Sequence, residues 1–525
     1  MKTALAILAM LAAAPAAAQQ PATHEAIPVT LGAGINGVRS GRIIVFARKI
    51  DDRAKVPQEV DTSPFEPTGT AIAARETWSL RPGEVATVDG DTDSFPSAFG
   101  KLPAGTYAFQ AVLDRNHDYN YGGRGPGDIV SPVIEAKLPG PIPTLTLDRV
   151  VPDTPIEQRL SRVPAAQRQP LIDALATVKA VDFTSPLLTE FWGRPMHIRG
   201  WVALPPGYGA SGKTFPTVYS TGGFGSTLDY DKLSAARMTA EMASGAMPPM
   251  IWVYLDESSP RGTHEFADSV NNGPWGQALT TEFIPWIEKR YAMDGKQSSR
   301  FLTGHSSGGW ATLWLQARYP QVFGGSWPTS PDPSDFHDFT NVDIYAAGAN
   351  AYHDAEGKPI PLVRDHAKLI ATLEQFAKME RVLGPYGGQF ASFNWVFSPK
   401  GPDGRPQPLF DFATGDVDSA VAAYWRDHYD IAYRIRHNWP ELKADLDGKI
   451  HLYVGTADTF YLDGAAHLLK QAFDSVGAHE DITFIPNKTH FDLMERGGDR
   501  EALMKDIAWS MYQHARPGVK RPDTK

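Results

Sequence analysis

The sequence contains no cysteine. A chain without cysteine has no disulfide bond, thiol nucleophile, zinc–thiolate site or iron–sulfur cluster, so its stability must come from packed cores. It also lacks any block of lysine and arginine, and its 50 basic and 60 acidic side chains give a formal net charge of −10. This charge balance argues against nucleic acid or an anionic membrane as a partner.

Long apolar runs are equally scarce. One run, residues 4–14, follows a charged start and precedes three alanines, which is the pattern of a signal peptide with its cleavage site. The run is too short for the ~20 apolar residues that cross a bilayer. We therefore expect a signal peptide at residues 1–18, export to the periplasm or the cell exterior, and no membrane insertion.

What is present is the composition of a globular protein long enough for two or three domains. Residues 27–147 predict an all-β, sandwich-like domain, because strand-like runs such as 42–47 and 106–112 recur between Gly, Pro and Asp clusters. Residues 148–187 predict a linker, punctuated by prolines, with a helix at 172–178.

Residues 188–516 predict an α/β domain, because strand-like runs alternate with longer helical stretches and such alternation builds a mostly parallel sheet flanked by helices. Within it, residues 330–446 form a long irregular insert that predicts a lid, with a helical piece at 368–382. The expected strands are 198–204, 217–220, 250–255, 300–303, 450–454 and 482–485, and the expected helices are 278–291, 308–319 and 465–476.

Ser306 is the candidate nucleophile. It stands in Gly304-His305-Ser306-Ser307-Gly308, a G-x-S-x-G pattern. A sharp turn between a strand and a helix lifts such a serine out of the chain, and the glycines leave room for the turn. The expected strand before the motif and helix after it provide that context. A serine-rich helix cap is the alternative, and we expect His305 to pack under the turn.

Asp458 and His490 are the candidate acid and base. Each follows the carboxyl end of an expected strand, where parallel sheets gather their active sites, and the order Ser, Asp, His fits the pattern. His490 would take the Ser306 proton and Asp458 would orient the imidazole. The rival acids are Asp463, which stands where an Asp ordinarily caps a helix, and Asp492. His451 and His467 lie inside an expected strand and an expected helix, so we expect each to be a packed or solvated histidine.

The candidate oxyanion hole lies after the strand at 217–220, in a glycine-rich turn. Phe224 or Gly223 would supply one backbone N–H and Ser307 the other. A plain flexible loop is the alternative interpretation of this turn.

Together these motifs resemble the esterase D-type branch of the α/β hydrolases, which includes feruloyl, acetyl-xylan and enterochelin esterases. The resemblance covers residues 188–512 and implies an α/β-hydrolase fold and ester hydrolysis without a metal or other cofactor. It rests on Leu204-Pro205-Pro206-Gly207-Tyr208, Gly222-Gly223, Gly273-Pro274-Trp275-Gly276, residues 279–285, the Ser306 turn, Gly455-Thr456-Ala457-Asp458 and His490.

Three other segments match the sequence pattern of a known motif without the structural context that the motif requires. Residues 207–214 fit a P-loop and residues 32–37 fit G-x-G-x-x-G, but neither leads into an expected helix, so we reject both. Asp114, Asn116 and Asp118 alternate as calcium ligands do, yet Tyr119 replaces the glycine that an EF-hand loop needs. A polar hairpin turn is the simpler interpretation of these three residues.

Three functions remain open at this point. The first is hydrolysis of a small-molecule or carbohydrate ester, with an aromatic substrate favoured by tryptophans that could supply stacking faces. The second is acyl transfer by the same triad, and the third is carbohydrate binding without catalysis. The tryptophans considered as substrate contacts, beside Phe224, are Trp275, Trp310, Trp327 and Trp395.

Overall fold

The structure, a computed structural model, describes residues 25–50, 55–160, 163–210 and 212–522. The expected signal peptide, residues 1–18, lies outside the described residues, so export remains a prediction. Within the described ranges, no helix is both long and apolar enough to cross a membrane.

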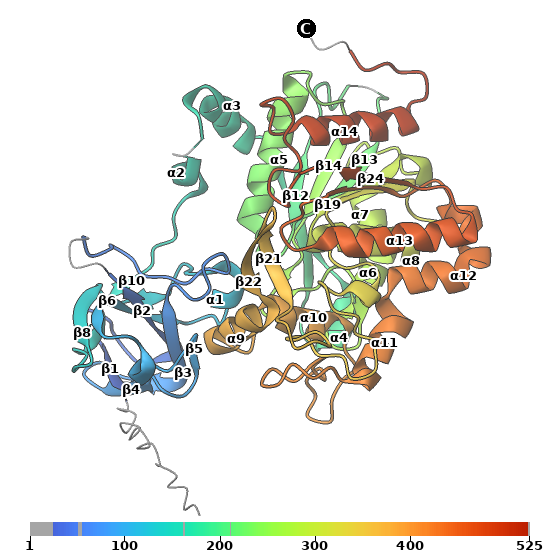
Figure 1. Ribbon diagram of the computed structural model, residues 1–525. Coiled ribbons are helices and arrows are strands. Elements are labelled where there is room, and N and C mark those ends of the chain that lie inside the picture. Colours follow the sequence, from blue (N-terminus) through green and yellow to red (C-terminus); the bar gives the residue numbers. More distant parts are fainter. Residues whose placement is uncertain (1–24, 51–54, 161–162, 211, 523–525) are drawn as a thin grey trace, which may run out of the picture.

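The N-terminal part of the chain forms a mainly antiparallel β region of two packed sheets (Figure 1). One sheet has the order β4-β1-β9, the other β10-β7-β6-β2-β3-β5, with β8 paired to β6. Alternate residues such as Ile43, Val45, Phe109 and Ala111 point between the sheets and form the core. The strands are β1 (Ala26–Leu31), β2 (Arg39–Lys49), β3 (Ala71–Leu80), β4 (Val85–Asp89), β5 (Ser94–Phe95), β6 (Gly105–Asp114), β7 (Ile129–Val130), β8 (Ile134–Leu138), β9 (Leu145–Leu147) and β10 (Arg149–Val150), and helix α1 (Tyr119–Gly122) follows β6.

The rest of the chain is built on an eight-stranded sheet of order β11-β12-β14-β13-β19-β20-β23-β24. The pairs β11–β12 and β12–β14 are antiparallel and all following pairs are parallel. The predicted α/β fold with an N-terminal all-β domain is thereby confirmed. The strands are β11 (Lys179–Thr184), β12 (His197–Ala203), β13 (Thr217–Thr221), β14 (Ile251–Leu255), β19 (Arg300–His305), β20 (Gly325–Thr329), β23 (His451–Gly455) and β24 (Asp481–Ile485).

Helices cover both faces of this sheet, and its central strands are therefore continuous apolar runs in the sequence. Val218 and Phe301 pack under helices of one layer, whereas their neighbours Tyr219 and Leu302 pack under the opposite layer. The first layer holds α3 (Ala165–Leu175), α5 (Leu228–Ala243) and α14 (Ala502–Ala515), and the second holds α4 (Pro186–Trp192), α6 (Trp275–Ala278), a π-helical turn (Leu279–Phe283) and α7 (Ile284–Glu288).

The segment expected as a lid, residues 330–446, is a packed part of the fold. Its side chains share one hydrophobic cluster with α8 (Ser307–Arg318), α13 (Leu462–Val476) and β23. Its helix α9 reaches the other way and lies beside β3 and β5 of the β region (Figure 1). The elements are η5 (Phe336–Asp338), β21 (Pro361–Asp365), β22 (Lys368–Thr372), α9 (Leu373–Leu383), α10 (Gln389–Phe397), α11 (Ser419–Tyr429) and α12 (Ile431–Leu446).

Two elements differ from the sequence predictions. The expected helix at 368–382 begins only at Leu373, because Thr372 and Gln375 form a capping box and β22 pairs with β21 before it. In the expected linker, α3 starts after Pro164 and ends at Leu175, and the linker also contains β11, the edge strand of the large sheet.

Candidate active site

Ser306 occupies the tight turn that joins β19 to α8, with φ 59° and ψ −125°. Such a positive φ is strained for a residue with a side chain. The flanking glycines are required sterically, because a Cβ at Gly304 would lie 2.2 Å from the Gly308 oxygen. A Cβ at Gly308 would lie 2.2 Å from the Gly222 oxygen. The turn therefore has the geometry expected of a nucleophile elbow.

The structure brings Asp458 and His490 together at the carboxyl ends of β23 and β24. His490 Nδ1 and Asp458 Oδ2 lie 3.0 Å apart, and both side chains are buried. Asp458 Oδ1 accepts the backbone N–H of Phe460 at 2.9 Å. Burial raises the pKa of Asp458, but the charge and hydrogen bond of His490 outweigh it and leave the pKa below its usual value. Asp458 is thus a charged acceptor for the imidazole.

The rival residues are engaged elsewhere. Asp463 pairs with Arg364 at 2.7 Å, and Asp492 accepts the backbone N–H and the hydroxyl of Thr489. His451 stacks on Trp327 in the core, with ring centroids 4.4 Å apart.

His467 and His305, two further histidines near the sheet, differ in their surroundings. His467 stacks on Phe484, away from the triad candidates. His305 contacts the candidate base, with ring centroids of His305 and His490 4.3 Å apart, rather than packing only under the turn. Burial first, and then the neighbouring His490, lower the pKa of His305 to about 3, so this ring is neutral at physiological pH.

Asp332 is a second buried carboxylate at this site, and the sequence analysis missed it. It follows β20, the strand between β19 and β23, and so lies at the same edge of the sheet as Asp458; residues 325–329 were not among the expected strands, which is why Asp332 was not predicted. Its Oδ2 accepts the hydroxyl of Ser307 at 2.6 Å. Burial raises its pKa to about 6, although the Ser307 hydroxyl and His490 act to lower it.

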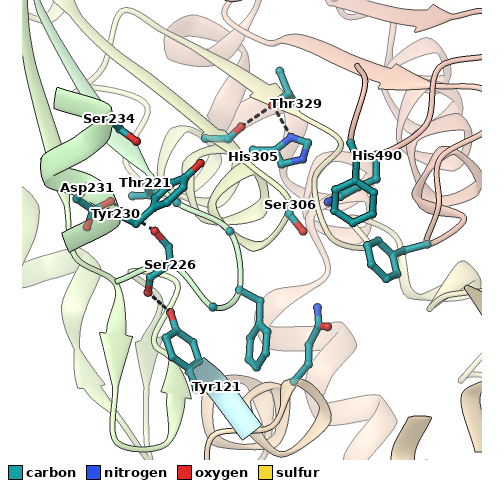
Figure 2. A pocket seen from close by; sticks show the side chains of 18 of the residues that line it. Tyr121, Thr221, Ser226, Tyr230, Asp231, Ser234, His305, Ser306, Thr329 and His490 are labelled. Atoms are coloured by element: carbon teal, nitrogen blue, oxygen red, sulfur yellow. Dashed lines mark hydrogen bonds between the residues drawn. The ribbon is translucent and has the colours of Figure 1, made fainter. Parts of the chain in front are cut away.

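A cavity of about 820 Å³ opens in front of these groups. Figure 2 shows Ser306 and His490 at this cavity, with His305 near them and Tyr121 on another wall. The expected oxyanion residues Gly223 and Phe224 line it, and Ser307 stands at the first position of α8, where helix N–H groups lack helical acceptors.

The tryptophans expected at the substrate do not line the cavity but pack in the cores. Trp275 stacks on His264, with ring centroids 3.6 Å apart, and Trp310 contacts Trp314 and Phe397. Trp327 lies against Phe301 and His451, and Trp395 lies under the guanidinium of Arg261. Large aromatic side chains stabilise a fold most when they are fully buried, which explains why these four tryptophans lie in the cores and not at the cavity.

The N-terminal β region supplies part of the cavity wall, a contact that no local sequence pattern predicts. Phe65, from the segment between β2 and β3, and Tyr121, from α1, both line the cavity. The Tyr121 hydroxyl donates to the Ser226 carbonyl at 2.6 Å, and its ring meets Phe224 edge-on at 5.0 Å. The β region therefore contacts the loop that carries the oxyanion candidates.

The possible metal ligands have protein partners. The Asp114 carboxylate accepts backbone N–H groups of residues 116–119, as in the polar turn that the sequence favours over a calcium site at Asp114, Asn116 and Asp118. Asp335, His337 and Asp430 approach one another closely enough to share an ion. However, Asp335 pairs with Arg436 at 2.7 Å and Asp430 accepts the Tyr345 hydroxyl.

The family model and the curated relatives that match this chain are all esterases. A family model described as putative esterase matches residues 190–473, more than half of the chain. Two esterases of Mycobacterium tuberculosis, from strains CDC 1551 and H37Rv, are each 28% identical over 168 residues. That match covers 30% of this chain and 35% of each relative, so the chain spans about a third of the length of these curated relatives.

Solved structures with similarity to the chain include a ferulic acid esterase, 16% identical, which covers 65% of this chain and 98% of its own at a TM-score of 0.38. An S-formylglutathione hydrolase from Agrobacterium tumefaciens is 14% identical, covers 64% of this chain and 95% of its own, and has a TM-score of 0.37.

Proposed function

The chain belongs to the putative esterase family, a family of carboxylic ester hydrolases, and from this premise we propose that it hydrolyses its substrate through an acyl-enzyme on Ser306. The observation that carries the proposal is the conjunction of a strained serine turn with a buried Asp458–His490 pair on one cavity. In the proposed triad, Ser306 is the nucleophile, His490 is the general base, and Asp458 orients the imidazole and stabilises its protonated form.

The first half of the reaction forms the acyl-enzyme. Ser306 Oγ attacks the ester carbonyl carbon while its proton passes to His490 Nε2, and the negative charge moves to the carbonyl oxygen. Backbone N–H groups of Ser307 and of the Gly223–Phe224 turn would hold that oxyanion. When the carbon–oxygen bond breaks, His490 gives its proton to the departing alkoxide, so a neutral alcohol leaves.

The second half returns the serine. A water molecule gives one proton to His490 as its oxygen attacks the acyl carbon, and the second tetrahedral intermediate collapses to a carboxylic acid. The proton on His490 then returns to Ser306 Oγ. Acceptance of the acyl group by an alcohol instead of water would use the same steps.

The test compares the mature parent with Ser306→Ala on p-nitrophenyl acetate and methyl ferulate, two esters that differ in both the acyl group and the alcohol. Loss of the nucleophile should lower kcat by about 10⁶-fold, the size of the loss in subtilisin. A fluorophosphonate should label one serine in the parent and none in the variant.

Ser307→Ala is the matched control, because Ser307 is the adjacent hydroxyl and the change keeps its backbone N–H. Peptide mapping should still find the label on Ser306 in this variant. A label that persists in Ser306→Ala and disappears in Ser307→Ala would contradict our assignment, and a parent that is neither active nor labelled would favour a binding protein without catalysis.

A further inference from the structure

Three phenylalanines from separate segments meet at the cavity beside His490. Phe65 comes from the β region, Phe460 follows β23 and Phe491 follows His490, and all three line the cavity. Phe65 has ring centroids 6.3 Å from Phe460 and 5.6 Å from Phe491, and Phe460 lies 6.0 Å from Phe491. We call this group the phenylalanine cluster.

Much of the phenylalanine cluster remains uncovered. Phe65 is 45% exposed and Phe491 is 66% exposed. Large apolar side chains exposed together, rather than singly, mark a surface that binds something. The interplanar angle is 73° for Phe65–Phe491 and 73° for Phe460–Phe491, so these rings meet nearly edge-on. The three rings therefore enclose a space and do not form one flat face.

The position of the cluster relative to the catalytic groups decides which half of an ester it would meet. The rings of Phe460 and Phe491 lie 4.9 Å and 5.4 Å from the ring of His490. In a triad the histidine protonates the departing oxygen, so the space around it holds the alcohol half of the ester. The oxyanion candidates, by contrast, lie beside Tyr121.

We propose that Phe65, Phe460 and Phe491 form the alcohol subsite of this enzyme and that the subsite takes an aromatic ring. This inference rests on the proposed function and specifies its substrate class. It assigns the β region a direct role in specificity, because Phe65 belongs to that region.

An aromatic ring suits the cluster better than a sugar. None of the three side chains offers a hydrogen bond, whereas aromatic rings pair edge-to-face at these spacings. Of the polar side chains that precede Phe65 in its own loop, Asp61 accepts the Tyr119 hydroxyl at 2.5 Å and Thr62 lies with its hydroxyl 3.3 Å from the Met379 sulfur. Sugar hydroxyls bound here would lose hydrogen bonds to water and gain few hydrogen bonds to the protein.

Phe65 is held in place by its own turn and by the docked β region. Its backbone N–H donates to the Ser63 hydroxyl at 3.1 Å, and Glu66, next in sequence, pairs with Arg48 of β2 at 2.8 Å. The ring is therefore presented to the cavity by a defined loop rather than by a free chain segment.

The test uses two isomeric esters that carry one phenyl ring on different halves. Benzyl acetate places the ring on the alcohol and methyl phenylacetate places it on the acyl group, with ethyl acetate as the ester without a ring. In Phe65→Ala, the ratio of kcat/KM for benzyl acetate to that for ethyl acetate should fall about three- to tenfold, the range of one aromatic pair. Phe65→Leu, which keeps an apolar side chain without a ring, should show a fall of similar size.

Trp78→Ala is the matched control, because Trp78 is an aromatic of the same β region that is 82% exposed and does not line the cavity. Its ester ratios should equal those of the parent. A fall that follows methyl phenylacetate instead, or an equal fall on all three esters, would overturn the assignment of the alcohol subsite.

The closing comparison separates this inference from the function on which it rests. A parent that hydrolyses the esters and is labelled on Ser306, together with an unchanged ratio in Phe65→Ala, would overturn the subsite alone. A parent that hydrolyses none of the esters and takes no label would overturn both proposals.

Discussion

Asp332 is a single buried residue whose protonation makes the stability of the fold depend on pH. Its carboxyl lies in the protein interior beside the Ser307 hydroxyl, and burial raises its pKa from 3.8 to about 6. A raised pKa means that the folded state holds the proton more tightly than the unfolded chain does. The stabilisation from that proton is complete below about pH 4 and is lost as pH rises through 6.

Asp332→Asn, which stays neutral at every pH, should remove this dependence. Relative to the variant, the parent should lose about 2–3 kcal/mol of unfolding free energy between pH 4 and pH 7, since each pKa unit corresponds to about 1.4 kcal/mol. Urea unfolding of both proteins across that range measures the difference. A difference that stays constant with pH would show that Asp332 is charged in the fold as readily as in water.

At the scale of single elements, the turn between β19 and α8 depends on glycine for space. Gly308→Ala would place a methyl carbon 2.2 Å from the Gly222 carbonyl oxygen. Two non-bonded heavy atoms cannot lie so close, so the end of β13 and the start of α8 must move apart. We expect a loss of about 1–3 kcal/mol in stability, as for other overpacked sites, and slower fluorophosphonate labelling of Ser306.

The control for this substitution is Gly34→Ala, where a Cβ would meet no atom within 4 Å. Thermal unfolding and labelling rates should match the parent in the control and differ in Gly308→Ala. Equal melting temperatures for the two variants would mean that the turn is looser than its geometry indicates.

The same scale shows what local patterns could predict. Strands such as β19 and β23 were predictable because most of their residues are buried and apolar, and glycines mark the Ser306 turn. The start of α9 was missed although its capping pair, Thr372 and Gln375, is a local signal. Alternation and turn chemistry are local, so sequence reasoning works best for them.

The contacts between segments far apart in the sequence could not be predicted. Arg42 Nη2 donates to the Val382 carbonyl at 2.8 Å across 340 residues, and Met379, Val382 and Leu383 of α9 complete a hydrophobic cluster with strands of the β region. No local pattern in residues 27–147 shows that they face α9 or that Phe65 reaches the cavity. That wall forms only where the β region packs against α9 and the residues around it.

At the scale of the whole molecule, Asn120 fixes this docking. Its Nδ2 donates to the carbonyls of Glu380 and Gly384 at 2.9 Å and 2.8 Å. Asn120→Asp keeps the shape but turns a donor into an acceptor that faces two other acceptors, at a cost of about 1–3 kcal/mol. We expect faster hydrogen exchange in α9 and in α1, measured by mass spectrometry, and a lower melting temperature.

Asn438→Asp, on the exposed side of α12, is the matched change away from the contact. It should leave exchange in α1 and α9 as in the parent. Unaltered exchange in both variants would contradict a docking that depends on Asn120.

The span between Arg42 and Val382 also has a consequence for biosynthesis. A ribosome adding about 5–20 residues per second needs about 20–70 s to make the 340 residues that separate the two partners. During that time the β region has already emerged, while the face formed by Phe46, Ile72 and Val112 has no α9 to cover it. A β region that folds before α9 is made therefore exposes this apolar surface until the later part of the chain covers it.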